Sequence, residues 1–90
     1  MPSRSESDAG PFECAALLIA AATGRSAHEI KPDDRLIDDF LMDSLEYLEI
    51  AMMIEETWGI LLDGATLKRL VTVADVARLL PPDARLPLAV

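Results

Sequence analysis

The segment DSLEYLEIAMMIEETWG, which starts at Asp43, is the feature that most constrains the fold of this chain. Asp43 followed three residues later by Glu46 is an acidic version of the capping box, which begins helices. The segment ends with Gly59, and glycine is the residue that most often follows the last turn of a helix. The two carboxylates also favour the positive end of a helix dipole. The segment therefore predicts a helix that begins at Ser44 and ends one or two residues before the glycine.

Two stretches precede this helix. Residues 11–23 are rich in Ala and Leu, begin with a proline that fits the first helical position, and are followed by Gly24, a natural stop. They predict a helix over Pro11–Thr23. Residues 25–42 contain Pro32 and two Asp pairs, and they predict a long loop with solvated acidic residues. We expect its isolated apolar side chains to pack beneath the helices: Ile30, Leu36, Ile37 and Phe40.

Two shorter helical segments are predicted downstream. Residues 60–70 indicate a turn and one or two helical turns, and Thr72, with Asp75 three residues on, caps a last helix that the Pro81-Pro82 pair ends. Because no segment alternates apolar and polar residues as a strand does, we expect an all-α fold. It is a small four-helix bundle with a long loop between its first two helices and a short third helix. The expected organisation is a flexible N-terminal tail (1–10), a folded domain (11–80) and a C-terminal tail (81–90).

Charge and composition exclude several classes of function. A net charge of −8 argues against nucleic acid and anionic membranes, and favours protein partners with basic patches. The single cysteine, Cys14, and the single histidine, His28, allow neither a disulfide framework nor a Cys/His metal site, so no metal is predicted. The longest apolar run, residues 14–22, is too short to span a bilayer, and the N-terminus has no signal-peptide pattern. We expect a soluble, cytoplasmic monomer.

The predicted helix from Ser44 has two apolar faces. At 100° per residue, five side chains form a core stripe: Tyr47, Ile50, Ala51, Ile54 and Trp58. Leu45, Leu48 and Met52 fall on the opposite side. Beside them runs a mostly acidic strip: Glu46, Glu49, Met53 and Glu56. Two explanations remain open at this point: a flanking helix or loop covers the second face, or a partner docks on it.

Ser44 itself has no catalytic neighbours in the sequence. An activated serine needs a base such as histidine and a third orienting group, whereas the one histidine lies sixteen residues upstream in the predicted loop. The chain is therefore not predicted to be an enzyme. Ser44 is either a simple helix-start residue or the target of another protein's chemistry.

The stretch DDFLMDSLEYLEIAMMIEETWGI resembles the signature of the acyl carrier protein family, D-L-G-x-D-S-L followed by an acidic amphipathic helix. Asp43, Ser44 and Leu45 match its central triplet. Other residues stand at the acidic and methionine positions of the family's recognition helix: Glu46, Glu49, Met52, Glu55 and Glu56. Downstream, TVADVARLL resembles the family's closing helix. The resemblance covers about residues 12–80.

This resemblance implies a function. In the family, a phosphopantetheinyl transferase uses coenzyme A to join 4′-phosphopantetheine to the serine hydroxyl through a phosphodiester, here Ser44 with Asp43 beside it. The arm carries an acyl group as a thioester in fatty-acid, polyketide or related specialised pathways. Acyl-loading and acyl-using enzymes with basic patches dock on the recognition helix. Carried over, the docking residues are Leu45, Glu46, Leu48, Glu49, Met52 and Glu56.

The chain also departs from the family pattern. Leu41 stands where the family usually has a glycine, Leu62-Asp63-Gly64 replaces a common I-P-D, and Lys68 and Arg69 stand where acidic residues are frequent. These changes bear on the cargo and on the partner enzymes. Two alternatives remain beside the fatty-acid or polyketide carrier: an unmodified small helical interaction module, and a carrier of amino acids or another unusual acid.

Overall fold

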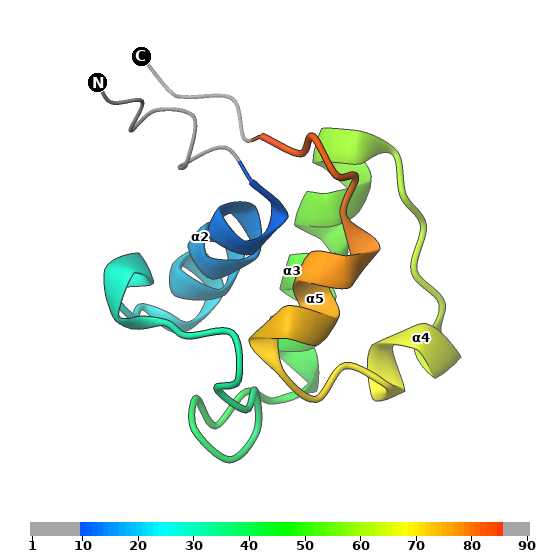
Figure 1. Cartoon of the computed structure of the whole chain (residues 1–90). Coiled ribbons are helices and arrows are strands. Elements are labelled where there is room, and N and C mark those ends of the chain that lie inside the picture. Colours follow the sequence, from blue (N-terminus) through cyan, green and yellow to red (C-terminus); the bar gives the residue numbers. More distant parts are fainter. Residues whose placement is uncertain (1–9, 86–90) are drawn as a thin grey trace, which may run out of the picture.

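The computed structural model describes residues 10–85, which form four α-helices and one 3₁₀ turn (Figure 1). Along the chain these are α2 (Pro11–Thr23), η1 (Ala27–Glu29), α3 (Ser44–Trp58), α4 (Gly64–Lys68) and α5 (Val73–Leu79). Within this range no strand forms, and the one extended pairing is an isolated bridge between Arg35 and Thr72. The all-α prediction, with a long first loop and a short third helix, is confirmed. Of the predicted tails, residues 1–9 and 86–90 lie outside the described part of the chain.

Local signals account for where the long helices begin and end. Pro11 opens α2, and Gly24 closes it in the left-handed conformation (φ 80°), with its N–H bonded to the Ala20 carbonyl. Gly59 ends α3 in the same way (φ 72°). Thr72 caps α5 through a complete capping box with Asp75. The predicted starts and ends of these helices are confirmed. Each depends on residues within one turn of the helix end, so the local sequence is enough to predict it.

The core is aliphatic and is built around α2, which contacts both α3 and α5. Small side chains at Cys14, Ala15 and Ala16 are fully buried and allow the neighbouring helices to approach closely. The partners supply larger buried side chains, Ile50 and Ile54 from α3 and two valines from α5: Val73 and Val76. Figure 1 shows α5 in front of α3, with α2 beside them on the left.

The long loop is held in place by hydrogen bonds to the start of α5. Leu36 N–H donates to the Val71 carbonyl, and Val73 N–H donates to the Asp34 carbonyl. Three of the four apolar side chains expected to pack inward do so: Ile30, Leu36 and Phe40. The prediction for Ile37 is wrong, because its side chain is exposed. Residues 35–40 make a helical turn. Leu36 and Phe40, four positions apart, share the inner side of this turn, so the Ile37 side chain points outward.

Two further observations limit what this fold can do. Within residues 10–85, no helix is long and apolar enough to cross a membrane. The same residues contain no group of three or more His, Cys, Asp or Glu side chains arranged to hold a metal ion.

Beyond α5, Ala84 is buried with the core, and its N–H donates to the Pro81 carbonyl.

Candidate functional site

Ser44 is the first residue of α3, and its side chain is exposed. The helix start is fixed by reciprocal bonds: the Glu46 N–H donates to Asp43 Oδ1 (3.0 Å), and the Asp43 N–H donates to Glu46 Oε1 (3.1 Å). The predicted capping box is thus complete. It orients the first turn while leaving the Ser44 hydroxyl open to solvent. The first N–H groups of the helix add partial positive charge beside that hydroxyl.

The turn that delivers Ser44 to the surface passes through a left-handed residue, Leu41 (φ 56°). The Leu41 N–H donates to the Ile37 carbonyl (2.9 Å), and the Met42 N–H donates to the Leu36 carbonyl (3.1 Å). The first of these bonds is the one that defines the αL motif at the end of a helical turn, in which the left-handed position is usually glycine. The turn buries Met42 in the core. The chain therefore reverses at Leu41 and places Asp43 and Ser44 outside.

An apolar groove of about 640 Å³ opens beside Ser44. Its walls come from four segments: the loop at 35–38, the first turns of α3, the helix α4, and Leu70 with Val71. Tyr47 and Leu48 line the α3 side, and Leu67 lines the α4 side. Three charged residues also line this otherwise largely apolar surface: Lys68 of α4, and Arg35 and Asp38 of the loop, which pair with each other. The groove combines residues distant in sequence, and sequence analysis did not predict it.

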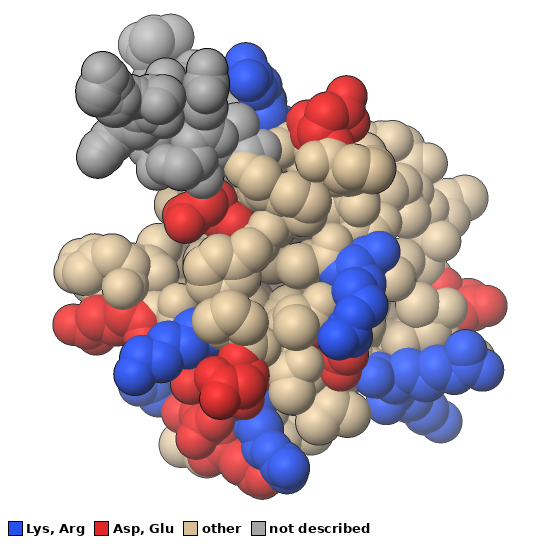
Figure 2. Space-filling model, viewed as in Figure 1, with Lys and Arg blue, Asp and Glu red and all other residues tan. Residues whose placement is uncertain are grey.

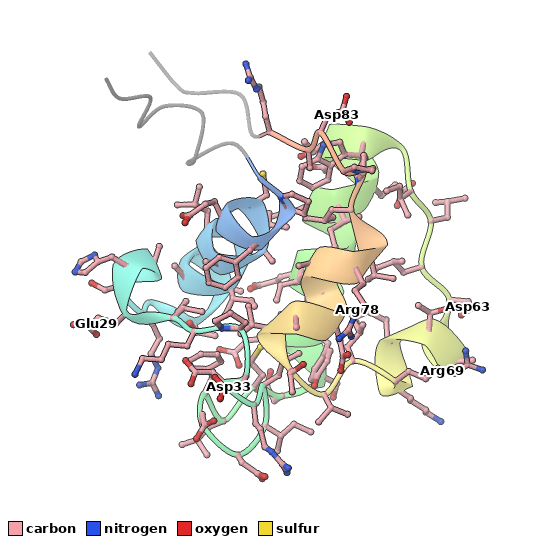
Figure 3. All side chains as sticks on the ribbon, in the orientation of Figure 1. Glu29, Asp33, Asp63, Arg69, Arg78 and Asp83 are labelled. Atoms are coloured by element: carbon pink, nitrogen blue, oxygen red, sulfur yellow. The ribbon has the colours of Figure 1, made fainter. Side chains whose placement is uncertain are left out.

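Tyr47 ties the two walls of this groove together. Its hydroxyl donates to the Leu70 carbonyl (3.0 Å), joining α3 to the segment between α4 and α5. Partial burial disfavours the phenolate and raises the pKa of Tyr47 above its ordinary value. Asp63 fixes the start of α4 by accepting from the Thr66 N–H (2.8 Å), and this backbone bond, first among several causes, lowers the pKa of Asp63. Asp63 is the N-cap and Arg69 the C-cap of α4, and Figure 3 labels both on the outer side of that helix.

The second apolar face of α3 is open. Leu45 is 65% exposed, Leu48 50% and Met52 57%. The alternative in which a flanking helix or loop of the described chain covers this face is therefore wrong. The exposed carboxylates Glu49 and Glu56 belong to the same surface.

Two members of the predicted acidic strip behave differently from the rest. Met53 is partly buried and packs against the core, so its place on the exposed strip is wrong. Glu46 is half-buried, and its carboxylate is already engaged in the capping box. The sequence predicts this hydrogen bond of Glu46, because Glu46 follows Asp43 at the spacing of a capping box. The exposed acidic part of the strip is Glu49 and Glu56, with Glu55 next to it on the helix.

Charges of the two signs lie on different helices. α3 carries four glutamates and no basic residue, whereas α4 and the residue after it carry Lys68 and Arg69. Figure 2 shows basic side chains over the corner that α4 occupies in Figure 1. On α5, Arg78 pairs with Asp75, which is itself held by backbone N–H groups. The face of α3 is thus acidic and the outer side of α4 is basic.

Comparison with known proteins gives one family and several relatives. The family model described as "Phosphopantetheine attachment site" matches residues 16–80. An acyl carrier protein of Helicobacter hepaticus is 32% identical over 65 residues, which cover 72% of this chain and 86% of that protein. An acyl carrier protein of Streptomyces coelicolor is 36% identical over 77 residues, covering 86% and 84%. The meromycolate extension acyl carrier protein of Mycobacterium tuberculosis is 38% identical over 59 residues, covering 66% and 51%.

Proposed function

Since this chain belongs to the acyl carrier proteins, which carry covalently attached 4′-phosphopantetheine and are not enzymes, we propose that Ser44 is the attachment residue. One observation carries this proposal. Ser44 lies exposed at the start of α3, beside an apolar groove and within the matched residues. The other described serine, Ser26, lies in the loop before η1 and does not line that groove.

The residues around Ser44 fit a phosphodiester. A primary hydroxyl in solvent is accessible to a modifying enzyme, and the free N–H groups of the first helical turn favour a neighbouring phosphate. The carboxylate of Asp43 accepts from the Glu46 N–H, so this negative charge is directed toward the helix backbone. When bound, the group supplies a thiol at the end of a flexible arm, on which an acyl group is held as a thioester.

The groove supports an aliphatic cargo. Its volume of about 640 Å³ falls in the range of small-molecule sites, and each methylene removed from water contributes about 0.8 kcal/mol. Leu48, Leu67 and Val71 offer the apolar walls that such a chain needs. A short aminoacyl group, with its charged amine, would leave these walls in water. We therefore favour a fatty-acid or polyketide carrier over a carrier of amino acids.

The open face of α3 supports docking by the enzymes that modify, load and unload the arm. Leu45, Leu48 and Met52 offer apolar contact area, and Glu49 and Glu56 lie beside them as steering charges. A complementary enzyme has an apolar patch rimmed by Lys and Arg. The Glu46 carboxylate contributes less to recognition, because it accepts the Asp43 N–H.

Intact-mass measurement tests the attachment. Incubation with coenzyme A and a broad-specificity phosphopantetheinyl transferase should add the mass of one phosphopantetheine to the wild type and nothing to Ser44→Ala. Ser26→Ala, which removes an exposed hydroxyl elsewhere, should gain the same mass as the wild type. If several transferases leave the wild type unchanged, the chain acts instead as an unmodified interaction module. A mass gain on Ser44→Ala would show that a residue other than Ser44 is the attachment residue.

A further inference from the structure

We propose that Leu41 is a specificity-determining contact for the phosphopantetheinyl transferase that modifies this carrier. Its side chain inserts into an apolar, basic-rimmed recess of that enzyme. This inference rests on the proposed modification of Ser44. It starts from a conflict between the residue type at position 41 and the backbone it must adopt.

The backbone at Leu41 is in a conformation that leucine disfavours. Its φ of 56° makes it the one non-glycine residue with positive φ among residues 10–85. The left-handed conformation brings Cβ toward the following carbonyl oxygen, a strain that glycine avoids. The conformation is enforced, since the N–H groups of Leu41 and Met42 both bond back across the turn. Residues before and after it are also anchored, because Leu36 and Met42 are both buried.

Nothing within the fold offsets this strain. The Leu41 side chain is 74% exposed, so it contributes little to the core. Glycine at this position would keep both hydrogen bonds and remove the clash. A leucine here raises the free energy of the folded carrier and adds exposed apolar surface. Strained backbone of this kind is concentrated at functional sites, and apolar side chains that gather on the surface mark interaction sites.

The position of Leu41 identifies the partner. Leu41 lies three positions before Ser44, so their Cα atoms lie at most about 11 Å apart. An enzyme footprint of about 800 Å² centred on Ser44 has a radius of about 16 Å and therefore includes Leu41. Two more exposed apolar side chains, Ile37 and Leu45, lie in the same stretch of chain. An enzyme that reaches the Ser44 hydroxyl therefore covers this apolar surface.

Charge defines the chemistry of the recess. Residues 35–46 hold four carboxylates and one basic residue, Arg35, which already pairs with Asp38 (3.3 Å). Arg25 also reaches this turn, where it donates to the Asp39 carbonyl (3.5 Å), so the carboxylates outnumber the arginines four to two. An acidic rim around apolar side chains is complementary to an apolar recess edged by Lys or Arg. A second copy of this carrier would bring the same acidic rim and would be repelled.

Two substitutions at one position separate contact from strain. Leu41→Ala keeps Cβ and the strained backbone but removes the rest of the side chain. Leu41→Gly removes the strain as well, and its melting temperature should rise by about 2–8 °C, whereas that of Leu41→Ala should stay near the wild type. Transferase kinetics are measured with coenzyme A while the carrier concentration is varied. Both variants should lose about 5- to 30-fold in kcat/KM, as expected for partial burial of a leucine side chain, through KM and with kcat retained.

The control variant is Leu61→Ala. Leu61 is 76% exposed but follows the C-terminal end of α3, at the other end of the helix from Ser44, and its loss should leave kcat/KM unchanged. If Leu41→Ala keeps the wild-type kcat/KM, the proposed contact is refuted while modification of Ser44 stands. A loss confined to Leu41→Gly would assign the effect to turn geometry and refute the contact. An equal loss in Leu61→Ala would show a non-local effect and refute it too. A wild type that no transferase modifies removes both proposals together.

Discussion

Replacing Tyr47 by phenylalanine tests how the groove beside Ser44 is held together. The change removes one hydroxyl and leaves the ring against the groove, so it isolates the bond from Tyr47 Oη to the Leu70 carbonyl (3.0 Å). Among residues 10–85 this is the side-chain hydrogen bond that links α3 to the segment between α4 and α5. Its loss should loosen one wall of the groove without disturbing the caps of either helix.

The size of the effect follows from the surroundings of the bond. A net hydrogen bond contributes about 0.5–1.5 kcal/mol. Leu70 is buried but lines the groove, so we use the middle of this range and add no full penalty for an unpaired acceptor. We expect a loss of about 1 kcal/mol in the free energy of unfolding. For a domain of this size that corresponds to a fall of about 4–8 °C in melting temperature.

Thermal melts followed by far-ultraviolet circular dichroism give the measurement, first at pH 7 and then at increasing pH. Burial raises the pKa of Tyr47, whereas the unfolded phenol ionises near its ordinary value of about 10. The stability linked to this proton is therefore present below about pH 10 and is lost as pH rises through the folded pKa. Tyr47→Phe lacks this contribution, so the difference in melting temperature between this variant and the wild type should shrink at alkaline pH. Equal melting temperatures at pH 7, or a deficit that grows above pH 10, would refute this account.

Two further predictions concern charges. Asp75→Ala removes a carboxylate that accepts two backbone N–H groups at the start of α5, and we expect a loss of about 1–2 kcal/mol in urea unfolding at pH 7. These bonds lower the pKa of Asp75, so the carboxylate adds to the free energy of unfolding above about pH 4, and this stability is lost as pH falls through the folded pKa. If the variant and the wild type lost stability identically between pH 7 and acid pH, this account would be contradicted. Glu49→Lys or Glu56→Lys should slow transferase modification about two- to tenfold at low salt and less at high salt, while Glu29→Lys on η1 should not. A low-salt rate that neither change on α3 alters would place the docking surface elsewhere.

Helix boundaries could be predicted because their causes are local. The capping box at Asp43 and Glu46 involves one turn of chain, and Gly24 and Gly59 end their helices through backbone conformations that few other residues adopt readily. Burial of Ile50 and Ile54 could be predicted in the same way, since their spacing of four places them on one side of α3. Ser44 was singled out by its place at a helix start and by the family pattern around it.

Features that depend on several segments could not be read from the sequence. The groove requires α4 and the loop at 35–38 to meet the first turns of α3, and no local pattern specifies that meeting. Ile37 was placed inside because isolated apolar residues in a loop have no visible period. Once residues 35–40 form a helical turn, Leu36 and Phe40 take the inner side and Ile37 is directed outward. Leu41 was noted as unusual, but the positive φ that makes it strained appears only when the turn is closed.

The exposed face of α3 is compatible with a stable single copy because of the charges around it. Leu45, Leu48 and Met52 would form a surface prone to self-association if the helix carried no carboxylates. Two copies that met through this face would bring their acidic strips together, and the net charge of −8 on each chain adds to this repulsion. An enzyme with a basic rim meets the opposite situation, since the same carboxylates attract it. If partners dock here as proposed, the glutamates of α3 would select them by the sign of their charge and would keep this apolar face open beside Ser44.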